Sequence, residues 1–202
     1  GLLGRAWMAL LAARGRPARG VGRPAFDLRD PASLEPLLRP APRAVINCAA
    51  YTDVDGAEAD EATATRINGD AVGALVARCD AHGVPLVHYS TDYVFGGEPR
   101  RTPYPIDHPP APINAYGRSK RVGERHLLAS PGPHLLVRTS WLYAPWGTSF
   151  VRTMARLART RDALRVVDDQ RGRPTSAEAL ARLSLALLAQ GRRGVFHGAD
   201  AG

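Results

Sequence analysis

Residues 114–120 read Asn-Ala-Tyr-Gly-Arg-Ser-Lys, and this stretch holds the chain's one lysine among 27 lysine and arginine residues. A chain that uses arginine almost everywhere keeps lysine where a compact ammonium with a tunable pKa does what a planar guanidinium cannot. Tyr116 and Lys120 are four residues apart and therefore share one face of a helix. The pair predicts acid/base chemistry on that face; the alternative is a leftover surface lysine.

Apolar runs of strand length alternate with helical patterns on both sides of this stretch. Runs typical of buried parallel strands lie at 44–48, 85–89, 135–139 and 194–198. Helical patterns start near residue 2 and return at 57–80, 116–120, 150–157 and 177–188. Strands that alternate with helices predict an α/β fold, here a doubly wound parallel sheet of the Rossmann type.

Local signals indicate where several elements begin or end. Asp30-Pro31 predicts the start of a short helix, and His82-Gly83 predicts the end of the 57–80 helical region. Thr175-Ser176-Ala177-Glu178 reads as a capping box that opens the last helix. A short strand is expected around Val21, and an irregular loop at 96–112.

Composition limits the class of protein. With 202 residues, 45% hydrophobic and 23% charged, the chain is typical of a globular cytoplasmic protein. It has no apolar run of bilayer-spanning length and no signal-peptide pattern, so no membrane contact is expected. The net charge of +8 comes from arginines scattered singly, which argues against nucleic-acid binding. Cys48 and Cys79 are expected to be unpaired thiols in apolar surroundings.

Three segments carry residues suited to chemistry. Ser90-Thr91-Asp92-Tyr93-Val94-Phe95 follows a predicted strand, where open α/β sheets place their ligands. Tyr116 and Lys120 form the second segment. Gly1-Leu2-Leu3-Gly4 opens a helix, whose N-terminus suits a pyrophosphate. Each pattern is common by accident, but their order and spacing are jointly specific.

The chain resembles the dTDP-4-dehydrorhamnose reductase family of the extended short-chain dehydrogenase/reductase superfamily. The resemblance covers nearly the whole chain. Besides the three segments above it rests on Asn47-Cys48-Ala49-Ala50-Tyr51-Thr52-Asp53-Val54-Asp55, Arg138-Thr139-Ser140-Trp141-Leu142-Tyr143 and Asp169-Gln170-Arg171-Gly172-Arg173-Pro174-Thr175. The last two phrases separate this family from generic sugar-nucleotide epimerases. The resemblance implies reduction of a nucleotide-linked 4-keto-6-deoxy sugar, dTDP-4-dehydro-L-rhamnose, to dTDP-L-rhamnose with NADPH or NADH.

The same resemblance implies roles for individual residues. Tyr116 would protonate the carbonyl oxygen, Lys120 would stabilise its phenolate and hold the nicotinamide ribose, and Thr91 would hydrogen-bond the carbonyl. A role of Thr91 in local backbone bonding is the alternative. Substrate contacts are expected from Thr91, Asp92, Tyr93 and Trp141, with core packing as the alternative for Trp141.

Cofactor contacts are expected from Tyr116, Lys120 and a further set: Gly1, Leu2, Leu3, Gly4, Arg23, Asp27, Leu28, Cys48, Ala49, Ala50 and Tyr51. An acidic residue at the end of the second strand binds a ribose 2′-hydroxyl, whereas arginine there accommodates a 2′-phosphate. Arg23 at this place favours NADPH, with NADH as the alternative cofactor. Arg23 as one more solvated arginine stays open.

Both ends of the chain look cut. We expect residues 1–145 to form a dinucleotide-binding domain without its first strand, and 146–202 to include elements shared with a truncated substrate-binding lobe. An absent central strand would leave a slot in the sheet. The chain is therefore not expected to fold well alone.

The residues leave other functions open. One is a sugar-nucleotide epimerase or dehydratase on the same fold, because Thr91-Asp92 offers an acid beside a hydroxyl. Another is a non-catalytic dinucleotide-binding subunit, like the relatives that bind a methionine adenosyltransferase. No residue spacing predicts a metal site; magnesium dependence and a homodimer are left open.

Overall fold

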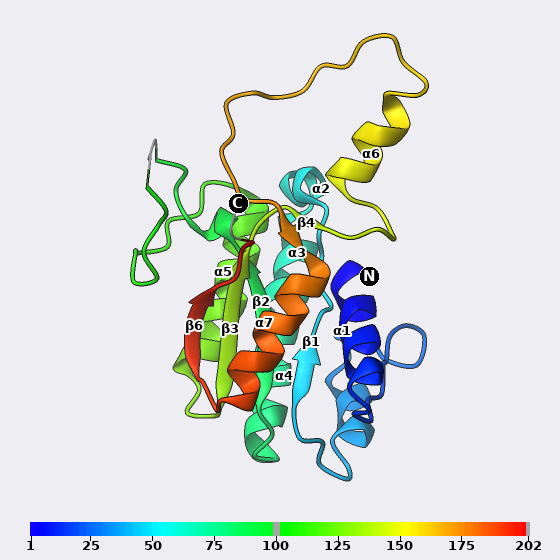
Figure 1. Cartoon of the computed structure of the whole chain (residues 1–202). Coiled ribbons are helices and arrows are strands. Elements are labelled where there is room, and N and C mark those ends of the chain that lie inside the picture. The colour runs from blue at the N-terminus through cyan, green and yellow to red at the C-terminus, as the bar shows by residue number, and fades with distance from the viewer. Residues whose placement is uncertain (99–101, 201–202) are drawn as a thin grey trace.

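A computed structural model of the chain describes residues 1–98 and 102–200. At its centre is a parallel sheet in the order β1-β2-β3-β6 (Figure 1). These strands are Val45–Asn47, Leu86–Thr91, His134–Thr139 and Gly194–His197. All four coincide with predicted apolar runs, so the α/β fold with a parallel sheet is confirmed.

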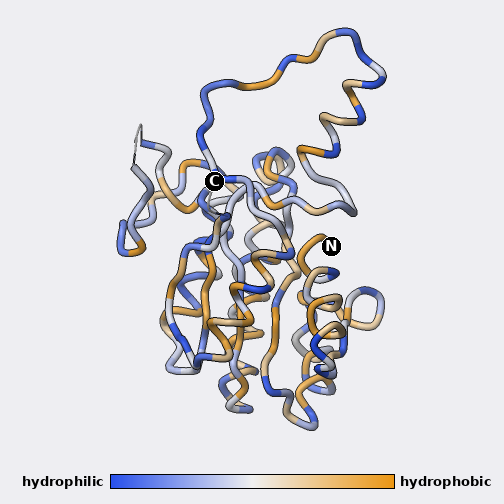
Figure 2. The backbone as a smooth tube through the Cα atoms, in the orientation of Figure 1, coloured by the Kyte–Doolittle hydropathy of each residue, from blue (hydrophilic) through white to orange (hydrophobic). Residues whose placement is uncertain are grey.

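Helices cover both faces of the sheet. The long helices are α1 (Leu2–Ala13), α4 (Ala71–Ala81), α5 (Ala115–Ala129) and α7 (Ala177–Ala189). Helices α1 and α7 pack on one face, against Val87 and Leu135 among others. Helix α4 packs on the other face, against Leu86 and Leu136. Alternate residues of β2 and β3 thus enter two separate cores, as expected for strands that are buried on both sides. Figure 2 shows hydrophobic stretches along the central strands and the helices beside them.

Shorter elements connect these layers. They are the 3-10 helix Pro31–Leu37, α2 (Val54–Ala59), α3 (Glu61–Thr65), a π-helical turn Arg66–Asp70, the 3-10 turn η3 (Asp92–Val94), β4 (Leu142–Tyr143), α6 (Phe150–Leu157) and β5 (Thr175–Ser176). Strand β4 pairs with β5 apart from the main sheet. Helix α6 buries none of its residues and projects from the body of the molecule (Figure 1).

The strand expected around Val21 does not form. Residues 16–22 have no regular structure, and the Val21 side chain is exposed. Among the described residues, β1 has β2 as its one hydrogen-bonded neighbour, so it ends the sheet. The slot expected within the sheet is therefore absent, because a slot requires a strand on its far side.

Smaller differences concern caps and helix continuity. Ser176, not Thr175, caps α7: its backbone is extended, α7 begins at the next residue, and its side chain accepts a hydrogen bond from the Ala179 N–H. The predicted 57–80 helix begins at Val54 and is interrupted at Asp60, whose side chain caps α3. The 96–112 loop is irregular over its described residues; 99–101 lie outside them.

The two cysteines differ in exposure. Cys79 is buried as expected, whereas Cys48 is exposed, and both are free thiols. Within the described residues, no helix combines the length and apolar character needed to cross a membrane.

Candidate active site

The carboxyl end of β2 brings the predicted hydroxyl residue to the edge of the sheet. Thr91 ends the strand and caps the 3-10 turn η3, with its Oγ1 accepting from the Tyr93 N–H at 3.2 Å. The same hydroxyl donates to Asp92 Oδ1 at 3.0 Å. Thr91 therefore also has the local bonding role named as its alternative, and burial raises the pKa of Asp92.

Helix α5 presents Tyr116 to this turn. Asn114 caps the helix by accepting from the Gly117 N–H at 2.7 Å, and Glu58 accepts from the Ala115 N–H at 2.7 Å. The Tyr116 ring meets the Tyr93 ring edge to face, with centroids 5.9 Å apart, and its hydroxyl shares a hydrogen bond with Thr91. Close packing makes this approach possible, because a Cβ on Gly117 would lie 2.1 Å from the Tyr93 carbonyl oxygen.

The surroundings of Tyr116 keep its phenol neutral. Burial, followed by the nearby charges of Asp92 and Tyr93, raises the pKa of Tyr116 to about 12, against the effect of the Thr91 hydrogen bond. A phenol with this pKa carries its proton at neutral pH. The arrangement therefore suits donation of a proton to a bound carbonyl group.

Lys120 lies one turn further along α5 and is almost completely buried, with 3% of its surface exposed. Its Nζ donates to the Tyr89 carbonyl oxygen at 2.7 Å. Burial lowers the pKa of Lys120 to about 8. An ammonium has three N–H donors, so Lys120 retains capacity to bind hydroxyl groups of a ligand. Its expected effect on the Tyr116 phenolate stays a prediction.

Asn68, which sequence reasoning missed, fixes the loop after β1 to the helix that carries Tyr116. It is fully buried in the π-helical turn. Its Oδ1 accepts from the Tyr51 N–H, while its Nδ2 donates to the Tyr51 carbonyl and to Ser119 Oγ at 3.0 Å each. Ser119 in turn donates to the Tyr116 carbonyl at 2.7 Å. The signal available in the sequence was Asn68-Gly69, two poor helix formers within a helical region.

The predicted cofactor-contact residues of the N-terminus and of the β1 loop lie together. Gly1 is the N-cap of α1, and no side chain caps this helix, so the first N–H groups are available to an anion. A Cβ built on Gly4 would lie 3.8 Å from the Cβ of Cys48, which places the two segments side by side. The next turn is fixed by Asn47, whose Oδ1 accepts from the Ala49 N–H at 3.0 Å. Ala50 and Tyr51 complete this turn, with the Tyr51 N–H bonded to Asn68. The free N–H groups at the start of α1 are therefore the donors that fit a dinucleotide phosphate.

The remaining cofactor predictions fall in a segment without a strand. Arg23 is exposed in a turn, not at a strand end. The Asp27 carboxylate is held by Arg29, with 2.5 Å between Oδ2 and Nη2, and these bonds lower its pKa. Leu28 is 5% exposed and packs in the core beside α4, so its side chain faces away from solvent.

Trp141 is half-exposed and adopts a φ of 45°, the one positive φ of a non-glycine residue in the described part of the chain. The segment before β5 packs on its ring, since a Cβ on Gly172 would lie 2.7 Å from the indole. Ser140 strengthens this contact by donating to the Arg173 carbonyl at 2.7 Å. The exposed indole is available to a ligand, unlike a core tryptophan.

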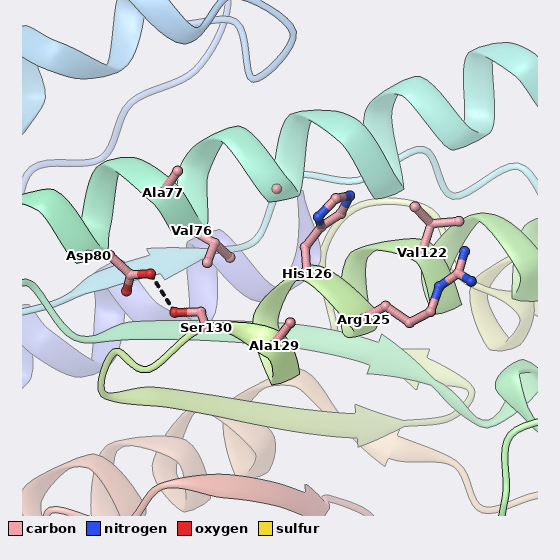
Figure 3. Close-up of a pocket in the computed structure, with 9 residues that line it drawn as sticks. Val76, Ala77, Asp80, Val122, Arg125, His126, Ala129 and Ser130 are labelled. Carbon is pink, nitrogen blue, oxygen red and sulfur yellow. Dashed lines mark hydrogen bonds between the residues drawn. The ribbon is translucent and has the colours of Figure 1, made fainter.

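A separate hollow of about 490 Å³ lies between α4 and α5 (Figure 3). It is lined by Gly73, Val76, Ala77, Asp80, Val122, Arg125, His126, Ala129 and Ser130. Ser130 donates a hydrogen bond to Asp80 across one end of it. Thr91, Tyr116 and Lys120 are not among its lining residues, so the hollow is not part of the candidate active site.

Known proteins resemble the chain over its whole length. A family model described as the RmlD substrate binding domain matches residues 1–202. A dTDP-4-keto-6-deoxy-D-glucose reductase of Streptomyces niveus is 43% identical over 204 residues, covering 100% of this chain and 70% of that protein. A dTDP-4-dehydrorhamnose reductase of Streptomyces griseus is 42% identical over 209 residues, covering 100% and 68%.

A solved structure agrees with these sequence matches. The dTDP-4-dehydrorhamnose reductase of Bacillus anthracis in complex with NADP superimposes with a TM-score of 0.94 at 34% identity, covering 100% of this chain and 72% of that one. The family relatives are thus longer than this chain, which is incomplete relative to them. By sequence and by fold, the chain belongs to the RmlD, or dTDP-4-dehydrorhamnose reductase, family.

Proposed function

We propose that the chain carries the cofactor-binding and proton-donating part of an NADPH-dependent reductase that converts dTDP-4-dehydro-L-rhamnose to dTDP-L-rhamnose. The observation that carries the proposal is the contact of a neutral Tyr116 phenol with Thr91, one helical turn from the buried Lys120 ammonium. Residues 1–145 would form the dinucleotide-binding part, and 146–202 would contribute to a substrate lobe.

The residues divide the chemistry as follows. A bound NADPH would supply the hydride to the ketone carbon of the sugar. Thr91 would orient the carbonyl oxygen by a hydrogen bond, and Tyr116 would transfer its hydroxyl proton to that oxygen as negative charge develops there. The resulting phenolate would regain a proton from solvent. Lys120 would hold ribose hydroxyls with its remaining N–H donors.

The cofactor assignment draws on the relatives. The Bacillus anthracis structure contains NADP, which supports NADPH for this chain. The N-terminus of α1 would bind the pyrophosphate, with the 48–51 loop beside it. Arg23 would neutralise the 2′-phosphate.

The sugar is the less constrained part of the proposal. The Streptomyces niveus relative is named for a different 4-keto-6-deoxy sugar, so both substrates share the ketone that Thr91 and Tyr116 would contact. Asp92, Tyr93 and the exposed Trp141 would contact the sugar.

Oxidation of NADPH in the presence of dTDP-4-dehydro-L-rhamnose tests the proposal, with NADH and dTDP-4-keto-6-deoxy-D-glucose in parallel. Tyr116→Phe should lower the turnover rate at least a hundredfold. It should leave the affinity for NADPH, measured by fluorescence, nearly unchanged. Equal turnover in the variant and the wild type would contradict the proton-donor role. Tight NADPH binding without any oxidation would favour a non-catalytic dinucleotide-binding subunit.

A further inference from the structure

Three charged side chains lie buried between α5 and the sheet. Lys120 and Glu124 come from α5, and Arg138 comes from β3; their exposed fractions are 3%, 0% and 5%. Arg138 binds Glu124 through two parallel bonds, Nε to Oε1 and Nη2 to Oε2, each 2.8 Å long. This bidentate geometry is the strongest form of an arginine–carboxylate pair.

Glu124 follows Lys120 by four residues, so the two side chains share one face of α5. Lys120 itself hydrogen-bonds a neutral acceptor, the Tyr89 carbonyl. A buried ammonium on a neutral acceptor is unfavourable unless a negative charge lies close by. Glu124 is in the position to supply that charge.

The other titratable groups near Lys120 do not compensate its charge. His88 on β2 interacts with Lys120, and burial keeps the pKa of His88 well below its ordinary value, so it is neutral. Tyr116, one turn earlier on α5, is neutral as well. Arg121 is a second partner of the carboxylate, donating to Glu124 Oε2 at 3.0 Å. Glu124 is thus the one negative charge among three cations, Lys120, Arg121 and Arg138.

Arg138 explains how a carboxylate stays ionised at this depth. Burial alone would raise the pKa of Glu124, but the hydrogen bonds and charge of Arg138 lower it below the ordinary value. The charge of Glu124 in turn raises the pKa of Lys120 against the effect of burial. Arg138 on the sheet therefore stabilises the Glu124 carboxylate, and this carboxylate stabilises the charged form of Lys120.

We propose that Glu124, held as a carboxylate by Arg138, is a positioning residue that keeps Lys120 as an ammonium ion. The proposal rests on the proposed function only for what Lys120 does with its charge. It predicts that removal of the Glu124 charge makes Lys120 a weaker base, whether or not the chain turns over a sugar.

The sequence offers a direct measurement. Because Lys120 is the one lysine, protein labelled with lysine carrying ¹³C at its ε carbon gives a single side-chain signal whose shift reports its protonation. We expect Glu124→Gln to lower the titration midpoint by about one pH unit or more. Glu124→Asp should restore part of the shift, because it returns the negative charge.

Glu61→Gln is the matched control. Glu61 also pairs with an arginine of α5, Arg118, through bonds of 2.8 Å, but both side chains are more than 40% exposed. This variant should leave the Lys120 midpoint unchanged. A folded Glu124→Gln protein with the wild-type midpoint would overturn the proposal.

A second variant covers the case in which Glu124→Gln does not fold. Glu124→Gln combined with Arg138→Leu removes both charges of the pair and should still lower the midpoint, whereas an unchanged midpoint would overturn the proposal. NADPH oxidation measured on the same proteins separates the outcomes. If the Glu124 variants have the wild-type Lys120 midpoint, the inference about Glu124 is wrong. If the wild type does not oxidise NADPH, the proposed function is wrong.

Discussion

Asn68 holds both backbone polar groups of Tyr51, accepting from its N–H at 2.9 Å and donating to its carbonyl at 3.0 Å. The same side chain bonds Ser119 on α5. One buried amide therefore sets the position of the 48–51 loop relative to the helix of Tyr116 and Lys120.

Replacement of Asn68 by alanine tests this relationship. The variant leaves the Tyr51 backbone groups without their partners, so we expect a loss of about 2 kcal/mol or more in the free energy of unfolding. NADPH affinity should fall as well, because the loop loses its fixed position. Urea unfolding and an NADPH titration measure the two effects. Unchanged stability in Asn68→Ala would rule the relationship out.

Gly117→Ala should damage the site although alanine is the better helix former. A Cβ there would lie 2.1 Å from the Tyr93 carbonyl oxygen, so η3 or α5 must move. Turnover should fall at least tenfold, and thermal unfolding should show a lower Tm. Gly22→Ala serves as the control, since its Cβ would meet no atom within 4 Å. Equal effects of the two substitutions would show that the contact with Tyr93 is unimportant.

Lys120 makes stability depend on pH in a defined window. Its pKa is about 8 in the folded chain, against an ordinary value of 10.5. Between these values the unfolded chain binds more protons, so this residue makes the protein more stable as pH rises from 8 to 10.5. Below pH 8 the burial of the charged Lys120 lowers the free energy of unfolding by its full amount, about 3 kcal/mol.

Lys120→Met should therefore be more stable than expected from its lost hydrogen bond at pH 7, with the advantage shrinking toward pH 10. Denaturant unfolding of both proteins at pH 7, 8.5 and 10 measures the difference. A stability difference that is constant across this range would mean that Lys120 titrates normally.

Arg23→Ala tests the cofactor preference. If Arg23 neutralises a 2′-phosphate, the variant should bind NADPH about tenfold more weakly or worse and keep its NADH affinity. Arg19→Ala is a suitable control, because Arg19 is exposed in the same irregular stretch. A parallel loss of affinity for both cofactors, or none for either, would remove Arg23 from the site.

The sequence predicts the parts of this fold that depend on local patterns. The 135–139 run gives β3 to within one residue, and the 150–157 pattern coincides with α6, whose N-cap Ser149 accepts from the Arg152 N–H. Apolar runs and caps are readable because each depends on a few neighbouring residues. The prediction of a strand around Val21 was wrong, because a strand forms only with a hydrogen-bonded partner elsewhere in the chain and the local sequence does not show whether one exists.

The candidate site also contains residues that local sequence patterns predict and residues that they do not. Thr91 and Tyr116 are predicted by their place after a strand and on a helix, and the structure brings them into contact. The roles of Asn68 and of the Glu124–Arg138 pair depend on tertiary packing. No local pattern in the sequence predicts these contacts, since each joins residues from different elements.

The segment from 158 to 174 determines where a protease should cleave the protein. All its residues except Leu164 are exposed, it contains several arginines, and it leads away from the body of the molecule before returning to β5 (Figure 1). An arginine-specific protease should cut here first. Helix α7 and β6, which follow the cut, remain packed against α1 and β3. The product should thus be a nicked protein that elutes as one species and separates into two fragments only in denaturant.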